Sequence, residues 1–539
     1  MSRFNLVAFT AVALCCLALP RRSWTQDRPV LELSLDEAVR RALENNVDIA
    51  VERFSPEEAA STVKQAEGVY DPYFASTLRK TSTIQPQRSV FTGGDKVETD
   101  SFVYNFGLAQ EFRTGGRLQF QFDNSRSNTN SVYTTFNPSF ASDFTASLTQ
   151  PLLRDRSIDA GRQQLKVAKN NREITDIQFR QTVINTLANV KNRYYDLLLA
   201  IDNLEAQRKS LALAQKLLEE NRIKVRVGTL APLDVVAAES EVASREEGVI
   251  VAQASLEEAE DALKRAIVPG HDPEVWALRI VPTDRPTAEP VEVNAEAAIR
   301  AAIESRTDVV AARKNLESSE IMLKYRRNQT LPALDLVASY GGSGVGGTEL
   351  RREGFGGPIL EEIPGGYGDA VSDALSFEYP TWAVGVSFSY PIRNRSAQAA
   401  SARARIAHEQ NLASFRRLEL MVATEVRTAA RAVETNFKRV ESTRAARRLQ
   451  EQRLDAEEKK FAAGMSTNFL VTQAQRDLAL AEVAELRAVA DYRKSLVDFE
   501  RVQEAGVSGI GGSTVTVSSG SSLTRSDVQS SQSGAPQPY

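Results

Sequence analysis

Two patterns of hydrophobic and polar residues alternate along this chain, and the first of them predicts very long helices. Residues 160–227 and 396–463 contain no Pro and no Gly apart from Gly161, and apolar residues recur at three-and-four spacing along the first stretch. At a rise of roughly 1.5 Å per residue, each stretch would reach on the order of 100 Å as a helix. Gly228 and Gly464 end the stretches, and a second helical pattern with heptad spacing follows each Gly. We therefore expect two long helical hairpins that turn at Gly228 and Gly464.

The second pattern is a strict alternation that lies ahead of each long helix and predicts amphipathic strands. In the second half, Trp382, Val384, Val386 and Phe388 alternate with small or polar residues. Soluble half-buried strands show the same alternation. Here the strands are few, and no globular sequence is left to cover the apolar face. We therefore favour strands that several chains pool into one membrane β-barrel.

The number of strands in the first half stays open at this point. Its alternating sequence, in residues 74–80, 101–112, 117–124 and 143–149, is long enough for an additional hairpin. The Gly-rich stretch 341–368 in the second half reads as a long surface loop.

The order of these patterns occurs twice, which indicates a duplicated unit of helix, strands, long helix and second helix. Residues 35–53 parallel residues 294–313, so that Asp48 corresponds to Asp308. Pro151 and Pro391 close the two strand regions and mark the junctions between strands and helices. The expected organisation is a first repeat 34–268 with strands within 73–150 and a hairpin 157–268, a Pro-rich linker 269–292, a second repeat 293–505 with strands within 333–391 and a hairpin 394–505, and a disordered Ser/Gly-rich tail 506–539.

The first residues predict export from the cytoplasm. An apolar run of 14 residues, Leu6–Leu19, follows Arg3 and fits a signal peptide over residues 1–25. The run contains both cysteines, Cys15 and Cys16, so the mature chain would have none. A lipid anchor on one of them is the alternative to cleavage, and the cleavage site itself stays open.

Composition narrows the function further. The chain has 66 Lys and Arg against 70 Asp and Glu, which provides no basic surface for nucleic acid. Its two histidines, His271 and His408, are far apart, and it contains no HExxH, GxSxG or P-loop motif. We therefore expect neither an enzyme nor a metal or cofactor site.

The duplicated order and several short motifs resemble the TolC family of outer-membrane factors. These motifs are TQPLL at 149–153, Gly228 followed by Asp234-Val235, and Gly464 followed by Ala474-Gln475-Arg476 and Leu478. The resemblance implies a mainly α-helical homotrimer with a 12-stranded β-barrel in the outer-membrane lipid, continuous with an α-helical barrel in the periplasm. It also implies the exit duct of a tripartite efflux pump or a type I secretion system. The duct would passively export small molecules or polypeptides, with a periplasmic adaptor and an inner-membrane RND or ABC transporter as partners.

The same resemblance places the periplasmic entrance at the hairpin tips, where this sequence departs from its relatives. Leu470 and Gln473 occupy positions that are often acidic in the family, and Ser466 occupies that of an Arg that latches the closed entrance. Asp234 matches the acidic partner of that Arg. We expect the entrance to be held closed by other contacts and to bind divalent cations weakly at Asp234, whose alternative role is that of a carboxylate at a helix N-terminus.

One competing interpretation belongs to another class of protein. A soluble periplasmic coiled-coil adaptor or scaffold would also carry an export signal and long helices. Such adaptors usually have a single hairpin flanked by β-rich domains, whereas this sequence predicts two hairpins and membrane-type strands.

Overall fold

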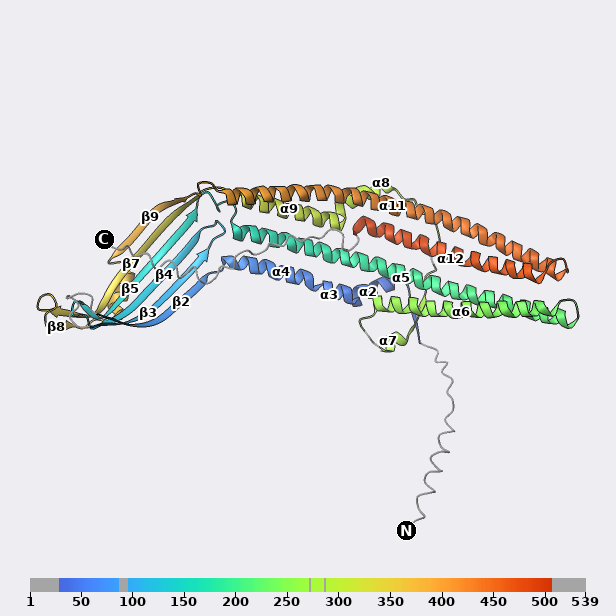
Figure 1. Ribbon diagram of the computed structural model, residues 1–539, viewed down its shortest axis with the longest axis horizontal. Coiled ribbons are helices and arrows are strands. Elements are labelled where there is room, and N and C mark those ends of the chain that lie inside the picture. The colour runs from blue at the N-terminus through green and yellow to red at the C-terminus, as the bar shows by residue number, and fades with distance from the viewer. Residues whose placement is uncertain (1–28, 87–95, 271–272, 286, 507–539) are drawn as a thin grey trace, which may run out of the picture. The chain divides into compact units, whose positions relative to one another are not determined.

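The computed structural model describes residues 29–86, 96–270, 273–285 and 287–506 (Figure 1). The predicted signal peptide with Cys15 and Cys16, the predicted tail beyond residue 506, and His271 lie outside the described residues. The chain divides into two compact units. The hairpin unit comprises the residues up to Ala50, Thr186–Val293 and Arg431–Asp498, and the strand unit comprises Val51–Asn185, Asn294–Ala430 and the residues from Phe499 on.

The two longest helices confirm the sequence prediction closely. They are α5 (Ala160–Arg226) and α11 (Arg395–Ala462), and each differs from its predicted bounds by one residue or none at either end. Each turns back into a second helix, α6 (Pro232–Ile267) after α5 and α12 (Asn468–Glu504) after α11. Because each of the longest helices contributes to both units, the units cut across the predicted repeats.

The core of the hairpin unit forms where the first hairpin meets a small parallel sheet. Strand β1 (Val30–Leu33) pairs with β6 (Arg279–Pro282), and the helices α2 (Leu35–Asn45), α3 (Val47–Glu52) and α7 (Pro273–Ala277) complete this region. Tyr194 is fully buried among apolar residues, and its hydroxyl donates a hydrogen bond to the carbonyl of Leu33 at 3.1 Å. A buried tyrosine needs such a partner for its hydroxyl, so this contact fixes β1 against α5.

The strand unit contains one antiparallel sheet flanked by the helices that lead into it. These helices are α4 (Phe54–Glu67), the short 3-10 helix η1 (Gly68–Tyr70), α8 (Ala295–Ser305) and α9 (Thr307–Asn328). The strands are β2 (Tyr73–Pro86), β3 (Lys96–Glu111), β4 (Arg117–Thr129), β5 (Phe136–Pro151), β7 (Ala333–Arg352), β8 (Ile359–Ile363) and β9 (Pro380–Ser389). Their order is β2-β3-β4-β5-β7-β8, with β9 also paired to β7.

The sheet of the strand unit has more strands than the four per chain that a 12-stranded barrel shared by three chains uses. Four strands of this sheet come from the first half of the described chain and three from the second. The difference arises mainly in the first half, where β2 and β3 pair over their whole length as an additional hairpin. The additional hairpin that the alternating sequence had left open is therefore confirmed, because β2 and β3 both carry enough alternating residues to pair.

The prediction of a long loop over residues 341–368 is wrong for much of that stretch. Strand β7 continues to Arg352, and helix α10 (Tyr367–Ser376) lies directly on its glycines. A Cβ added to Gly342 or Gly344 would lie only 2.4 or 2.1 Å from a carbonyl oxygen of α10. The glycines therefore permit close packing of a helix on a strand, a role that their composition alone had hidden.

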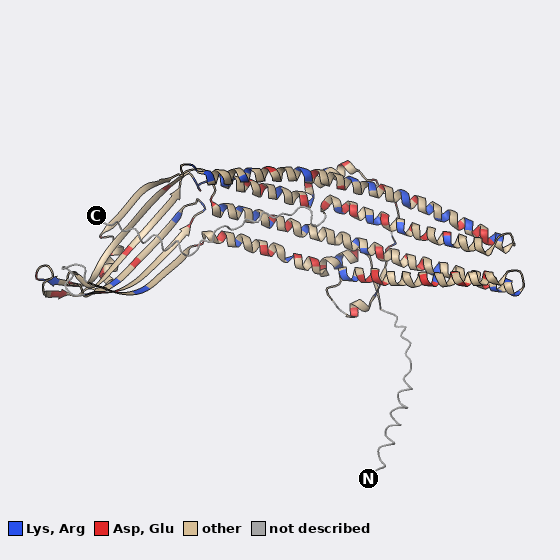
Figure 2. Cartoon of the chain, in the orientation of Figure 1, with Lys and Arg blue, Asp and Glu red and all other residues tan. Residues whose placement is uncertain are grey.

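Towards the helices, β3, β4, β5, β7 and β9 each have one apolar and one polar face, as the alternation predicted, whereas β2 also carries polar side chains on its apolar face. Helix α10 packs on part of the apolar face, where Phe377 contacts Phe144, which corrects the expectation that no segment covers this face. Directly paired residues form apolar rows across the sheet, for example Phe74, Leu108, Phe120, Ala146, Tyr340 and Trp382. The opposite face carries polar side chains such as Gln119, Gln121 and Ser147. Charged residues are sparse on the strands and dense along the helices (Figure 2). Among the described residues, no helix combines the length and the apolar character needed to cross a membrane.

Candidate functional site

The tips of the two hairpins have the backbone geometry that the sequence predicts. Gly228 and Gly464 adopt φ angles of +80° and +75°, and a Cβ added to either would have no heavy atom within 4 Å apart from those of its chain neighbours. Each helix end is closed by a backbone bond that spans the turn, from Thr229 to Lys224 at 2.9 Å and from Met465 to Lys460 at 2.8 Å. Glycine is therefore needed at both positions for its left-handed conformation rather than for space.

Large apolar side chains are exposed beside both glycines. Leu233 is 75% exposed at the first tip, and Met465 and Phe469 are 76% and 72% exposed at the second. Leu470 and Gln473, at the predicted entrance positions, are exposed as well. The tips therefore present large apolar side chains next to exposed cations such as Arg226 and Lys459.

Ser466 bonds within its own hairpin and not to Asp234. Its hydroxyl donates to Oε2 of Glu457 at 2.8 Å, and Lys460 forms an ion pair with the same carboxylate at 2.8 Å. Hydrogen bonds from Lys460 and Ser466 lower the pKa of Glu457. Asp234 is half-buried in the first turn of α6, and its carboxylate has no hydrogen bond or ion pair with the described residues.

Buried amides join the first hairpin to the second near the tips. Nδ2 of Asn221, on α5, donates to Oδ1 of Asn468, at the start of α12, over 2.9 Å, and both side chains are buried. Asn468 also donates to the carbonyl oxygen of Asp234 at 3.4 Å. Beside this pair, Nζ of Lys224 lies 3.4 Å from the centre of the Phe461 ring, a cation–π contact between α5 and α11.

A buried carboxylate connects the hairpins a few turns further along. Glu241 on α6 is 5% exposed and accepts hydrogen bonds from Nε of Arg245 at 2.8 Å and Nε of Arg476 at 3.0 Å. Burial alone would raise the pKa of Glu241, but the two guanidinium groups outweigh it and hold that pKa below its ordinary value. We call the six residues that link the hairpins the tip clasp: Asn221, Lys224, Glu241, Phe461, Asn468 and Arg476.

Sequence reasoning missed the tip clasp because its partners are far apart in the chain. Arg476 belongs to one of the motifs that carry the family resemblance, but nothing local singles out Glu241 among the many acidic residues of α6. The available signal was weak: Glu241 directly precedes Val242, the first residue of the heptad pattern, and a charge beside a buried stripe calls for a partner.

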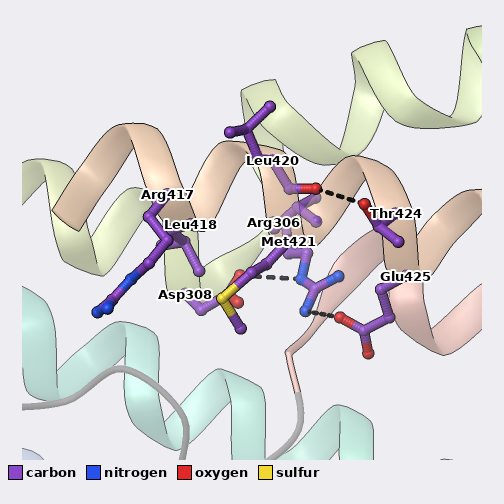
Figure 3. Close-up of a pocket in the computed structure, with 9 residues that line it drawn as sticks. Arg306, Asp308, Arg417, Leu418, Leu420, Met421, Thr424 and Glu425 are labelled. Atoms are coloured by element: carbon purple, nitrogen blue, oxygen red, sulfur yellow. Dashed lines mark hydrogen bonds and ion pairs between the residues drawn. The ribbon is translucent and has the colours of Figure 1, made fainter. Parts of the chain in front are cut away.

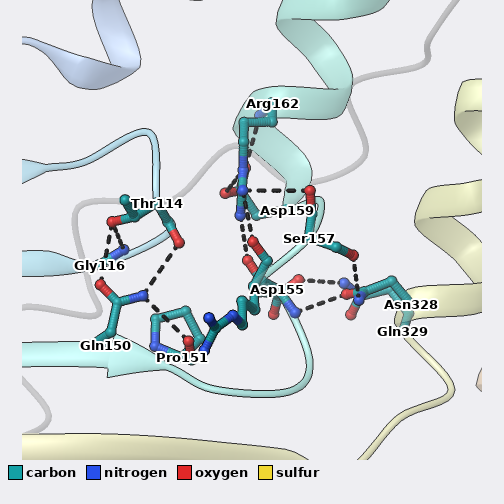
Figure 4. Close-up of polar contacts among 11 residues, drawn as sticks. Thr114, Gly116, Gln150, Pro151, Asp155, Ser157, Asp159, Arg162, Asn328 and Gln329 are labelled. Atoms are coloured by element: carbon teal, nitrogen blue, oxygen red, sulfur yellow. Dashed lines mark hydrogen bonds and ion pairs between the residues drawn. The ribbon is translucent and has the colours of Figure 1, made fainter.

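The strand-to-helix junctions at Pro151 and Pro391 form a second candidate site. After Pro151, the backbone N–H of Asp155 donates to Asn328 at 2.7 Å, and Arg162 holds the start of α5 through Asp159 at 2.6 Å (Figure 4). After Pro391, the side chain of Asn394 donates to the carbonyl of Thr330 at 3.1 Å. Both junctions are thus fastened to the end of α9 or to the segment that follows it.

An open pocket of about 480 Å³ lies beside a buried charge network in the strand unit (Figure 3). The side chain of Arg306 is 3% exposed and forms ion pairs with Asp308 at 2.9 Å and Glu425 at 2.6 Å. It also donates to the carbonyl of Val502 at 3.1 Å. Because these bonds occupy the guanidinium, the network braces helix ends and offers no free group to a ligand.

Neither a metal centre nor a catalytic constellation emerges from the described residues. Nowhere among them do three His, Cys, Asp or Glu side chains gather as a metal site would require. Nδ1 of His408 lies 2.8 Å from the hydroxyl of Ser319, in a helix-to-helix contact.

Comparison with known proteins completes this description. The family model for the Outer membrane efflux protein matches residues 119–267 and 298–502, well over half of the chain. No curated protein matches the sequence.

Solved structures share the fold at low identity. A membrane protein from Pseudomonas aeruginosa is 17% identical with a TM-score of 0.62, covering 88% of this chain and 94% of its own. The outer-membrane channel OprN is 17% identical with a TM-score of 0.64, covering 88% and 90%. The Campylobacter jejuni CmeC outer membrane channel is 15% identical with a TM-score of 0.61, covering 87% and 85%. The chain therefore belongs to the outer membrane efflux protein family.

Proposed function

We propose that this protein is the outer-membrane channel of a tripartite export system and acts as its passive exit duct. The observation that carries the proposal is that the sheet of the strand unit has one apolar face and two open edges, in a chain that belongs to this family. An apolar face of this kind belongs in lipid, where open strand edges must pair. A homotrimer that pools its strands in the outer membrane satisfies both requirements.

The long hairpins supply the periplasmic part of the duct. Their tips form the entrance, and a periplasmic adaptor with an inner-membrane RND or ABC transporter docks there and supplies both cargo and energy. The family and the solved relatives are channels rather than enzymes, so no bond-making step is assigned to this chain. Efflux of small molecules and type I secretion of polypeptides use the same duct, and the partner decides between them.

The tip clasp supports an entrance that is closed at rest. Ser466 supplies no cationic latch, and the buried bonds of Asn468 and Arg476 instead join the two hairpins of one chain. Opening requires these bonds to break, with docking of the adaptor as the source of free energy. Asp234, with its unpaired carboxylate, is the group that would bind a divalent cation weakly.

Fractionation of cells distinguishes this proposal from the soluble adaptor or scaffold. We expect the full chain in outer-membrane fractions, extracted by mild detergent as a trimer whose migration on gels changes with heating. A chain recovered only from the soluble periplasm would overturn the channel and favour the scaffold.

A further inference from the structure

The sheet contains more membrane-length strands than a shared 12-stranded barrel can use. A strand that crosses the bilayer needs roughly 9–11 residues. Six strands of the sheet have 10 to 20 residues, and only β8, with five, is too short. The open edges of this six-stranded segment are β2 and β9, and β9 is exposed along its entire length.

The strands are offset from one another along their length in the same way as the strands of a closed barrel. In the paired row that runs from Phe74 on β2 to Trp382 on β9, Phe74 lies one residue from the helix-proximal end of its strand. The corresponding separations on β3, β4, β5, β7 and β9 are three, three, five, seven and seven residues. From β2 to β9 this separation grows by about six residues, each of which rises ~3.3 Å along the strand. The growth takes place across five inter-strand spacings of ~4.8 Å, so the strands are tilted by about 40°. Barrels show strand tilts of about 35–45°.

We propose that β9 of each chain pairs with β2 of the next copy, so that three chains close an 18-stranded barrel. The proposal rests on the trimeric outer-membrane channel proposed above. Strand β2 leaves the helix-proximal end and β9 returns to it, so the two edges meet antiparallel. Continuing the same stagger by one strand brings Trp382 opposite Lys80 or Ser82 of the neighbouring copy and keeps the apolar faces on one side.

The extra strands make the pore wider. The diameter of a barrel grows in proportion to its strand number, so a barrel of 18 strands has a backbone diameter about 1.5 times that of one with 12. At a tilt of about 40° the backbone diameter is about 36 Å, in the range where barrels hold an aqueous channel. The polar face of the sheet, with Gln119, Gln121 and Ser147, lines this channel.

Cysteine cross-linking tests the interchain pairing without background, because the only cysteines of the chain are Cys15 and Cys16, within the predicted signal peptide. The test combines Val384→Cys on β9 with Leu78→Cys or Lys80→Cys on β2, positions that the stagger brings together. We expect one of these pairs to form covalent dimers and trimers upon oxidation in outer membranes. The matched control combines Val384→Cys with Phe122→Cys on β4, the strand that β9 would meet in a 12-stranded barrel.

Each result has a distinct meaning. Cross-linking through β4 would overturn the 18-stranded barrel in favour of 12 strands. Electron microscopy of the trimer counts the strands independently of register, and any number other than 18 in a trimer would also overturn the proposal while leaving the channel intact. Absence of the chain from the outer membrane would instead contradict the proposed function itself.

Discussion

Asn46 donates a hydrogen bond from Nδ2 to the carbonyl oxygen of Ala266 at 2.9 Å, at the C-terminal end of α6. The second repeat contains an equivalent contact that is made by a different side chain. There, Arg306 donates to the carbonyl oxygen of Val502 near the C-terminal end of α12. Asn46 and Arg306 stand two residues before Asp48 and Asp308, the pair that aligns the two repeats. In each half, the residue between the first two helices therefore satisfies a carbonyl at the end of the returning helix.

Replacing Arg306 by Ala should strongly destabilise the protein. The change leaves two carboxylates and a carbonyl without their buried partner, and breaking a buried ion pair in this way costs about 3–5 kcal/mol. Thermal unfolding of the detergent-extracted protein measures the loss. Arg405→Ala is the matched control, because the side chain of Arg405 is 61% exposed and lies 4.0 Å from its carboxylate partner. Equal stability of the two variants would contradict a structural role for the network.

The features that the sequence predicted correctly depend on neighbours along the chain. The bounds of α5 and α11 follow from helical spacing and from the absence of Pro and Gly, and the φ angles at Gly228 and Gly464 follow from local turn chemistry. The placement of α10 on the β7 glycines was not predictable in this way. It depends on which strand face lies beneath a segment some 25 residues later, which no local pattern specifies.

The tip clasp shows the same limit at longer range. Glu241 and Arg476 are 235 residues apart, and their pairing requires both hairpins to be in place. Heptad spacing predicts that α6 and α12 each have a buried stripe, but it does not fix which turn of one meets which turn of the other. The strand count likewise depended on whether alternating segments pair, which the sequence left open.

Replacing Gly344 by Val should displace α10 from the sheet. The new Cβ would lie 2.1 Å from the carbonyl oxygen of Ala370, and overpacking of this kind costs about 1–3 kcal/mol. We expect a lower yield of folded protein and a lower temperature for the heat-dependent change in gel migration. Gly385→Ala on β9 is the control, because a Cβ there has no atom within 4 Å in the described structure. Normal folding of the Val variant would show that α10 does not rest on β7.

Divalent cations test the expected role of Asp234. Three copies of an unpaired carboxylate at a narrow entrance would attract such ions, so Co²⁺ should reduce the current of the channel in planar bilayers. Asp234→Ala should abolish this block, whereas Asp477→Ala, which removes a carboxylate paired with Arg453 at 2.9 Å, should preserve it. If the block persists in Asp234→Ala, Asp234 acts only as a carboxylate at the N-terminus of α6.

Acidification should release the tip clasp through Glu241. Its pKa is lowered while Arg245 and Arg476 are bound to it, so the stabilisation is complete above the ordinary carboxyl pKa of about 4.3 and is lost as the pH falls through the lowered value. We therefore expect the open fraction of the wild-type channel to rise steeply below about pH 4 in planar bilayers.

The variant Glu241→Gln should raise the open fraction already at neutral pH. The loss of one charged hydrogen-bonded contact, part of which is solvent-exposed at Arg476, amounts to about 1–2 kcal/mol, or roughly tenfold in the ratio of closed to open entrances. The matched control is Glu239→Gln on the same helix, which removes an exposed ion pair with Arg222 and should leave gating unchanged. If Glu241→Gln retains the full acid response and the closed resting state, the entrance is held by the Asn221–Asn468 amides, and Asn468→Ala should then open it.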